Sequence, residues 1–260
     1  MRKSRVKAKW AAGKPAYCIN LALTDPSVCE MVSMMSVDCI WIDLEHHATS
    51  VETANQMMRA VRAGGDADVM ARPGKGEFMR MGRLLEAGAQ GILYPRCDNA
   101  AEAKEVVRWA KFAPLGERGA DSSNPDNPYA FQPIPSYVQE ANEETFVAIQ
   151  IESPSAAAVA GEIAAVEGVD MVFFGPADYG LLSGNTLGGT PEKSREAADQ
   201  VCKDVTAAGK VFSTLCFSEA DMQHFVDIGA KFLSMGNDIM MIRAGLARLQ
   251  KKLEPMGFEF

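Results

Sequence analysis

The chain has 260 residues, and its 26 Lys and Arg against 34 Asp and Glu give a formal net charge of −8. Such an acidic chain lacks the basic surface that binds nucleic acids and anionic membranes, so we expect neither as a partner. Because 47% of its residues are hydrophobic, it is expected to fold rather than remain disordered.

Neither the first residues nor the cysteines indicate export. The basic first ten residues are not followed by an apolar run that could form a signal-peptide core, and no stretch approaches the roughly 20 apolar residues that cross a bilayer. The six cysteines stand singly, without a C-x-x-C pair and apart from the three histidines. We therefore expect a soluble cytoplasmic protein whose cysteines are buried, reduced thiols.

Eight short runs of apolar and β-branched residues recur along the chain and predict strands. They span residues 17–23, 39–43, 68–71, 91–94, 146–151, 171–174, 211–215 and 232–235. Segments with helical spacing follow at 51–63, 77–86, 100–111, 194–207, 219–227 and 239–253. Ser50 and Ser218 stand where N-caps are expected, and E-A-G-A-Q-G, A-A-G-K and D-I-G-A-K place glycines where left-handed helix ends are expected.

The alternation of strands and helices predicts a single (β/α)8 barrel over residues 1–260, since a doubly wound sheet more often stops at five or six strands. Two connections are long. The first, 112–136, holds five prolines, so we expect irregular structure with a structural or subunit-contact role. The second, 175–190, is rich in glycine and follows a strand, so we expect it at the carboxyl-terminal face, where barrels build active sites.

Polar residues gather at the carboxyl-terminal ends of four predicted strands, in W-I-D-L-E-H-H, M-A-R-P, I-Q-I-E-S-P and F-F-G-P-A-D. In a barrel these strand ends meet in one bowl. We therefore expect a common pocket near Asp43, Glu45, His46, His47, Arg72, Gln150, Glu152 and Asp178.

Two carboxylates of this pocket suggest a metal site. Glu152 and Asp178 follow adjacent strands without a cysteine or paired histidine beside them, an oxygen-rich setting that suits Mg²⁺ or Mn²⁺ better than zinc. Salt bridges with a pocket arginine are the alternative. Arg72 ends an apolar strand and is costly to bury without an anion, so it should meet a substrate carboxylate or one of these acids.

One histidine is a candidate general base, and the positions of the lysines indicate whether a Schiff-base mechanism is feasible. Asp43 precedes His46 by three residues and could fix its ring, which would make His46 a general base, whereas His47 is expected to be a surface group. A Schiff-base aldolase needs a lysine on a barrel strand or its end, and only Lys75 could reach the pocket. A metal-stabilised enolate is therefore favoured over an iminium.

Seven motifs in order resemble the HpcH/HpaI aldolases, a family of metal-dependent pyruvate aldolases. They are W-I-D-L-E-H, A-R-P, L-L-E-A-G-A-Q-G-I-L-Y-P, P-L-G-E-R-G, Q-I-E-S, G-V-D-M-V-F-F-G-P-A-D and S-M-G-N-D. The resemblance as a whole runs from about Tyr17 to Leu246. The resemblance implies a (β/α)8 barrel that assembles as a hexamer through exchange of the last helix, about 239–253. It also implies cleavage of a 4-hydroxy-2-oxo acid to pyruvate and an aldehyde, with Mg²⁺, Mn²⁺ or Co²⁺ as cofactor.

The same resemblance implies roles for individual residues. Glu152 and Asp178 correspond to the metal ligands, His46 to the base with Asp43 as its acidic neighbour, and Arg72 to the group that holds the enolate oxygen. Glu86 falls where some members carry an aspartate that increases the basicity of the histidine. The substrate-binding residues implied are Gln150, Gly175, Pro176, Ala177 and Leu215.

Two departures from the family pattern concern the substrate. Asn20 stands at about the place where many members carry a tryptophan, and R-G-A-D-S-S-N-P-D-N-P-Y replaces a run of small residues and arginine. The aldehyde pocket is therefore expected to be reshaped. Two alternatives stay open: a related metal-enolate lyase or condensing enzyme acting on a CoA thioester or a longer acid, and a degenerate barrel that binds small keto acids.

Overall fold

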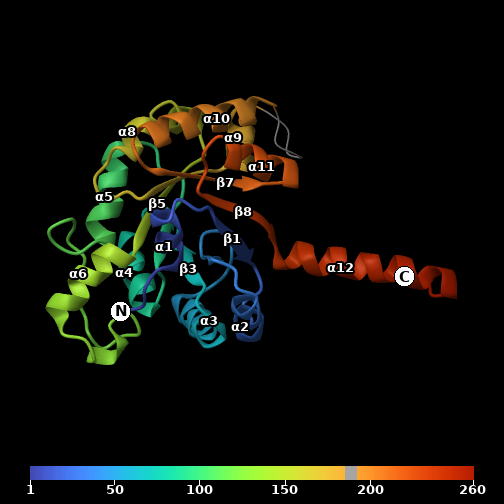
Figure 1. Cartoon of the computed structure of the whole chain (residues 1–260), viewed down its shortest axis with the longest axis horizontal. Helices are drawn as coiled ribbons and strands as arrows, with labels where there is room; N and C mark the ends of the chain where they lie inside the picture. The colour runs from blue at the N-terminus through green and yellow to red at the C-terminus, as the bar shows by residue number, and fades with distance from the viewer. Residues whose placement is uncertain (185–191) are drawn as a thin grey trace.

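Eight parallel strands close into one barrel in the computed structural model, which describes residues 1–184 and 192–260 (Figure 1). Each strand pairs with the next in the sequence, and β8 pairs with β1. The strands are β1 (Ala16–Leu21), β2 (Cys39–Asp43), β3 (Asp68–Arg72), β4 (Gly91–Tyr94), β5 (Phe146–Ile151), β6 (Met171–Phe174), β7 (Val211–Cys216) and β8 (Phe232–Asn237). The predicted (β/α)8 barrel is confirmed, and four of the eight strands have the predicted bounds.

Most of the helices pack around the barrel, while α12 projects from it. The helices are α1 (Arg5–Ala11), α2 (Pro26–Met34), α3 (Val51–Gly64), α4 (Phe78–Ala87), α5 (Ala100–Ala110), α6 (Ile134–Glu144), α7 (Pro154–Ala157), α8 (Ala160–Ala164), α9 (Pro176–Leu182), α10 (Glu192–Ala207), α11 (Glu219–Asp227) and α12 (Asp238–Leu253), with short 3-10 turns η1 (Pro128–Ala130) and η2 (Glu254–Met256). The predicted caps are confirmed, since Ser50 and Ser218 each accept a hydrogen bond from the backbone three residues on. Gly88, Gly209 and Gly229 adopt the positive φ expected at helix ends.

Helix α1 packs at the amino-terminal end of the barrel. Its residue Trp10 packs edge-on against Phe146, with ring centroids 5.5 Å apart, and also contacts Phe232. The buried Asp68 carboxylate accepts hydrogen bonds from the Ser4 hydroxyl and from the amide of Val6. This end of the barrel is therefore filled, which leaves the carboxyl-terminal end for chemistry.

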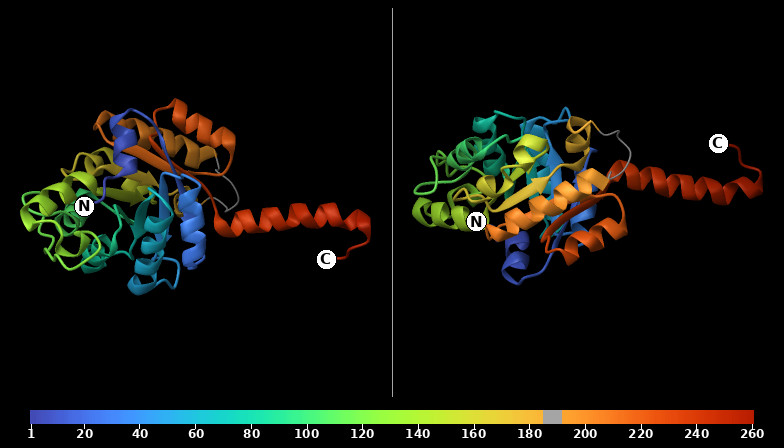
Figure 2. Two further views of the ribbon diagram at one scale, coloured as in Figure 1. Left: turned by 60° about the horizontal axis from the view of Figure 1, so that its bottom comes forward. Right: turned by 90° about the horizontal axis from the view of Figure 1, so that it is seen from above.

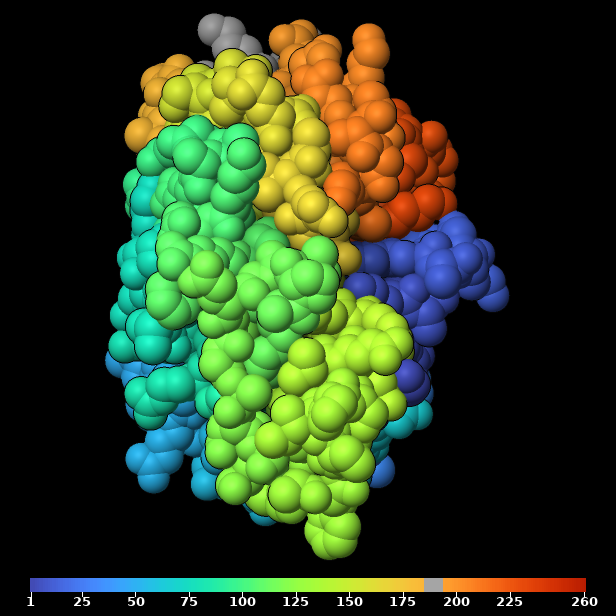
Figure 3. Space-filling view, turned by 90° about the vertical axis from the view of Figure 1, so that its left-hand side faces the viewer, coloured from blue at the N-terminus to red at the C-terminus, as the bar shows by residue number. Residues whose placement is uncertain are grey.

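The long connection after α5 contains more regular structure than predicted. Residues 112–136 were expected to be irregular, but η1 lies within them and α6 begins at Ile134. Proline suits the first turn of a helix because the amides there have no helical partner, so Pro135 is compatible with α6. Figure 3 shows this connection and α6, in green to yellow-green, covering one side of the molecule. The other long connection, 175–190, begins with α9, and its residues 185–190 lie outside the described part.

Helix α12 leaves the barrel and projects from it (Figures 1 and 2). The buried Asp238 carboxylate accepts hydrogen bonds from the amides of Ala22 and Leu23 and so fixes the start of this helix. Beyond that point its apolar side chains are exposed, including Met240, Ile242, Leu246 and Leu249. Within the described residues, no helix combines the length and the hydropathy that crossing a membrane requires.

Candidate active site

The site is organised around Arg72, the last residue of β3. Asp43, the last residue of β2, pairs with it in register. Arg72 Nε lies 2.9 Å from Asp43 Oδ1 and Nη2 lies 2.5 Å from Asp43 Oδ2, so the two side chains form a buried bidentate ion pair. The guanidinium carbon also lies 4.6 Å from the centre of the Trp41 ring. Burial alone would raise the pKa of Asp43, but its bonds to Arg72 outweigh burial and lower it.

A chain of hydrogen bonds links this ion pair to β5. Arg72 Nη1 donates to Gln150 Oε1 at 3.3 Å, and Gln150 Nε2 donates to Glu152 Oε1. Arg72 Nη1 also lies 3.1 Å from Glu45 Oε2. The carboxyl-terminal ends of three strands are thus joined by one polar network, as their positions at the strand ends predicted.

Glu152 lies at the far end of this network with one oxygen unsatisfied. Its Oε2 atom is buried and has no hydrogen-bond partner among the described residues. Burial, followed by the negative charges of Asp178 and Glu45, raises the pKa of Glu152 to about 7. Asp178 lies in the first turn of α9, directly after β6. A Cβ atom at Gly175 would lie 2.6 Å from Glu152 Oε1, so the backbone between β6 and α9 closely approaches this carboxylate.

These two carboxylates fit a hard divalent cation. The described residues contain no cluster of three or more His, Cys, Asp or Glu that could hold a metal ion. Mg²⁺ is commonly bound through one or two carboxylates with water and substrate oxygens completing its shell. The unsatisfied Glu152 oxygen and the neighbouring Asp178 supply such a donor set, whereas zinc would need three or four protein ligands.

The histidines are arranged differently from the sequence expectation. The Asp43 carboxylate is engaged by Arg72 and by the amide of Glu45, and no hydrogen bond joins it to the His46 ring. Instead, His46 Nε2 lies 3.6 Å from Glu45 Oε2, and the His46 side chain is 55% exposed. His47, expected at the surface, is half-buried, and its charge contributes to the lowered pKa of Asp43. The carboxylate beside His46 is therefore Glu45.

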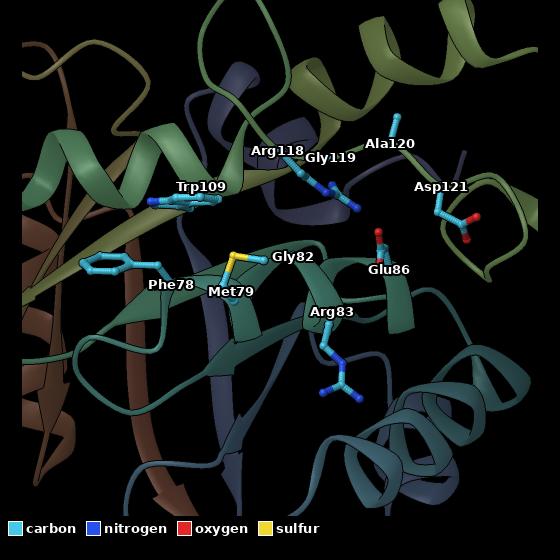
Figure 4. A pocket seen from close by; sticks show the side chains of 10 residues that line it. All are labelled: Phe78, Met79, Gly82, Arg83, Glu86, Trp109, Arg118, Gly119, Ala120 and Asp121. Atoms are coloured by element: carbon cyan, nitrogen blue, oxygen red, sulfur yellow. The ribbon is translucent and has the colours of Figure 1, made fainter.

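Glu86 does not join this site within the chain. It lies near the carboxyl-terminal end of α4, which leads into the amino-terminal end of β4, whereas His46 follows the carboxyl-terminal end of β2. Parallel strands place these positions at opposite ends of the barrel. Figure 4 shows Glu86 in a groove between α4 and the segment after α5, facing Arg118 and near Asp121. Within one chain, Glu86 therefore cannot contact His46 and increase its basicity in the way that the family resemblance implied.

Two cavities open at the mouth of the barrel. One, of about 330 Å³, is lined by Asp43 and Arg72 together with Leu215, as expected, and Asn20. The other, of about 200 Å³, is lined by Glu152, Lys75 and Arg96 among others. Sequence reasoning missed Arg96, although it follows a correctly predicted strand by two residues. In the cavity of about 330 Å³, sequence reasoning also missed the apolar and small residues, because they carry no polar signal. These are Cys216, Phe217, Met235, Gly236 and Met240.

Comparison with known proteins points to one family. The family model described as HpcH/HpaI aldolase/citrate lyase matches residues 17–244. The chain is 32% identical over 244 residues to a hydroxypyruvate/pyruvate aldolase of Delftia acidovorans, which covers 94% of this chain and 90% of the relative. It is 32% identical over 238 residues to a 4-hydroxy-2-oxo-heptane-1,7-dioate aldolase of Shigella sonnei, covering 91% and 89%. The crystal structure of an HpcH/HpaI aldolase from Desulfitobacterium hafniense matches 98% of each chain with a TM-score of 0.89 and 30% identity.

Proposed function

The chain belongs to the HpcH/HpaI aldolase/citrate lyase family and is an aldolase of that family, and we propose that it cleaves a 4-hydroxy-2-oxo acid into pyruvate and an aldehyde. One observation carries this proposal: a buried polar network runs from Asp43 through Arg72 and Gln150 to Glu152, and it ends on an unsatisfied carboxylate oxygen beside Asp178. A scaffold protein has no need to bury such a network, since unsatisfied polar groups cost stability.

Glu152 and Asp178 would hold a divalent cation, Mg²⁺, Mn²⁺ or Co²⁺. When bound, the cation supplies Lewis-acid stabilisation of the negative charge that develops on the 2-oxo acid. Gln150 donates to Glu152 Oε1 through its side-chain amide and so fixes the carboxylate that would hold the cation. Gly175, Pro176 and Ala177 bring the backbone of the α9 start against the same place.

Arg72 would hold the oxygen on which charge accumulates. Asp43 occupies two of its N–H groups, and Gln150 and Glu45 face its Nη1 atom, so the plane of the guanidinium is fixed. Among the described residues Nη2 has no hydrogen-bond acceptor besides Asp43, so its second N–H would donate to substrate. A donor held in place before the reaction stabilises an enolate oxygen without reorganisation in the transition state.

His46 would be the general base. In the cleavage direction a base removes the proton of the C4 hydroxyl, the C3–C4 bond breaks, and its electron pair passes to the C2 oxygen to form the pyruvate enolate. Protonation at C3 then completes pyruvate. Glu45, within 3.6 Å of the His46 ring, is placed to stabilise the imidazolium that forms. The exposure of His46 gives the abstracted proton a route to solvent.

The exposed apolar surface of α12 supports an oligomer in which this helix packs on another copy of the chain, as the hexamer implied by the family resemblance would require. A monomer would leave Ile242, Leu246 and Leu249 in water. We place the assembled enzyme in the cytoplasm.

A coupled assay tests the proposed reaction. Purified protein supplied with Mn²⁺ or Mg²⁺ is incubated with a panel of 4-hydroxy-2-oxo acids, and pyruvate is followed with lactate dehydrogenase. We expect pyruvate release from at least one acid, its loss on chelation, and its recovery when metal is restored. Binding of the acids without any product would instead favour a keto-acid binding protein.

A further inference from the structure

Arg96 lies at the mouth of the barrel near Glu152, one of the two proposed metal ligands. It follows the carboxyl-terminal end of β4, next to the strand that carries Gln150 and Glu152. The amide of Cys97 donates to the Gln150 carbonyl at 3.0 Å, so the ladder between the strands continues past the end of β4. Arg96 and Glu152 line the same cavity of about 200 Å³. The position of Arg96 is therefore set by the strand that builds the site.

Lys75 and its neighbours hold the backbone of Arg96 in place. Lys75 Nζ, from the loop after β3, donates to the Arg96 carbonyl at 2.7 Å and to Asp98 Oδ2 at 2.6 Å, and it lies 3.3 Å from Glu102 Oε1. The Tyr94 hydroxyl donates to the same Glu102 oxygen at 2.8 Å. Two carboxylates thus neutralise Lys75 and tie the loops after β3 and β4 together.

The guanidinium of Arg96, in contrast, has no partner in the part of the chain that the structure describes. None of the ion pairs or side-chain hydrogen bonds found there includes it, whereas Arg72 is engaged by Asp43 and Gln150. Because Arg96 lines the cavity that Glu152 also lines, its side chain faces the mouth of the barrel. Arg96 also has a φ of 52°, a conformation that is unfavourable for a residue other than glycine and that persists only where the surroundings impose it.

We propose that Arg96 binds an anionic group, a carboxylate or a phosphate, at the far end of the aldehyde half of the substrate. This inference rests on the proposed function, in which Glu152, Asp178 and Arg72 serve the 2-oxo acid half. An arginine presents a planar fork of donors that matches carboxylate and phosphate oxygens. Because its neighbour Lys75 is already neutralised, Arg96 is the arginine or lysine lining this cavity that has no carboxylate partner among the described residues.

The proposal is tested in the direction of aldol addition with four aldehydes and saturating pyruvate and Mg²⁺. Succinic semialdehyde carries a carboxylate and glyceraldehyde 3-phosphate carries a phosphate, while butanal and glyceraldehyde are their neutral counterparts. Arg96→Gln is compared with the native enzyme and with the matched control Arg80→Gln, which removes a partly exposed arginine of α4 paired with Glu77.

We expect Arg96→Gln to lower kcat/KM about tenfold for at least one anionic aldehyde and less than twofold for the neutral ones. The anionic aldehyde affected identifies carboxylate or phosphate as the group bound. The loss should shrink at high salt, because exposed charge pairs are screened. A uniform loss with all four aldehydes would assign Arg96 to the shared 2-oxo acid half and overturn the proposal, and so would unchanged kinetics.

Binding separates this proposal from the proposed reaction. If the native enzyme turns over none of the aldehydes, the reaction assigned above fails, and calorimetry with the Mg²⁺-loaded protein still tests Arg96. The probes are 2-oxoheptanedioate and 2-oxoheptanoate, which differ in the distal carboxylate. Arg96→Gln should weaken binding of the diacid about tenfold and leave the monoacid unchanged. Equal binding of the diacid by both proteins would contradict a distal carboxylate site.

Discussion

Arg72 connects more of the site than any other single side chain described above. Its guanidinium bonds to Asp43 and Gln150, lies 3.1 Å from Glu45, and stacks over Trp41. The sequence predicted that an arginine ending an apolar strand must meet an anion. It did not identify Asp43 as that anion, because the register of two parallel strands depends on closure of the whole barrel.

Substitution of Arg72 tests this arrangement. Arg72→Ala removes the donor to the enolate oxygen, and we expect kcat to fall by about 10²- to 10³-fold, the usual cost of losing an oxyanion donor. Arg72→Lys should restore little of it, because an ammonium cannot reproduce the bidentate bond to Asp43. Pyruvate release gives kcat, and circular dichroism checks that the fold is retained. Near-native turnover by Arg72→Ala would remove Arg72 from the mechanism.

Gly175 offers a second test at the level of one residue. In Gly175→Ala the new Cβ would lie 2.6 Å from Glu152 Oε1 and 2.7 Å from its Cγ, so the carboxylate must move. We expect Mn²⁺ affinity to fall by at least tenfold, as measured by calorimetry. The matched control is Gly161→Ala, whose Cβ meets only Asp204 Cβ at an ordinary 3.7 Å. Equal Mn²⁺ affinity in the two variants would separate Glu152 from the metal site.

At the scale of elements, the connection between α5 and β5 is held by a buried lysine. Lys111 Nζ donates to the carbonyls of Asn142 and Thr145 at the carboxyl-terminal end of α6, where helical carbonyls lack partners. The sequence placed Lys111 at the end of a helix but could not show that it caps another one. Such contacts depend on how α6 folds back, and prolines alone do not determine that path.

Burial of Lys111 makes stability depend on pH. Burial lowers its pKa to about 8 from 10.5, so between these values the unfolded chain binds more protons than the folded one. The Lys111 contribution to the free energy of unfolding therefore rises with pH, by about 1 to 2 kcal/mol between pH 7.5 and 9.5. The free energy of unfolding is measured with urea at both pH values. It should rise more in the native protein and in the control Lys104→Met than in Lys111→Met. An identical pH dependence in all three proteins would contradict a depressed Lys111 pKa.

At the scale of the whole molecule, α12 is the element that a single barrel does not explain. Its start is fixed to the barrel by Asp238, while Met240, Leu246 and Leu249 are each at least half exposed. A helix with an unburied apolar surface gains stability only by packing against something else. The helix itself was predictable from its spacing, but its direction away from the barrel was not.

We predict that α12 mediates assembly. Size-exclusion chromatography with light scattering should give an oligomer for the native chain and a smaller species for Leu246→Glu combined with Leu249→Glu, because burying carboxylates in an apolar contact is costly. Lys252→Glu, an exposed charge change on the same helix, is the control and should leave the mass unchanged. A monomeric native chain would contradict this role.

The barrel could be predicted because local signals agree along the chain: apolar runs give the strands, and Gly88, Gly209 and Gly229 end helices before three of them. The positions of Arg72 and Glu152 could also be predicted, because both lie at the carboxyl-terminal ends of strands and a parallel barrel brings these ends together. Loop residues could not be placed in this way. The His46 ring lies beside Glu45 rather than Asp43, because the carboxylate of Asp43 forms an ion pair with Arg72, a residue distant in sequence.

The central claim is that Glu152, with Asp178 and Arg72, forms an enolate from pyruvate with a divalent cation. It is tested most directly by proton NMR of C3 deuterium exchange of pyruvate in D₂O, which needs no knowledge of the aldehyde. We predict rapid exchange with Mg²⁺, loss of exchange on chelation, and loss in Glu152→Gln but not in the control Glu162→Gln on α8. Exchange that persists in Glu152→Gln and after chelation would contradict the account.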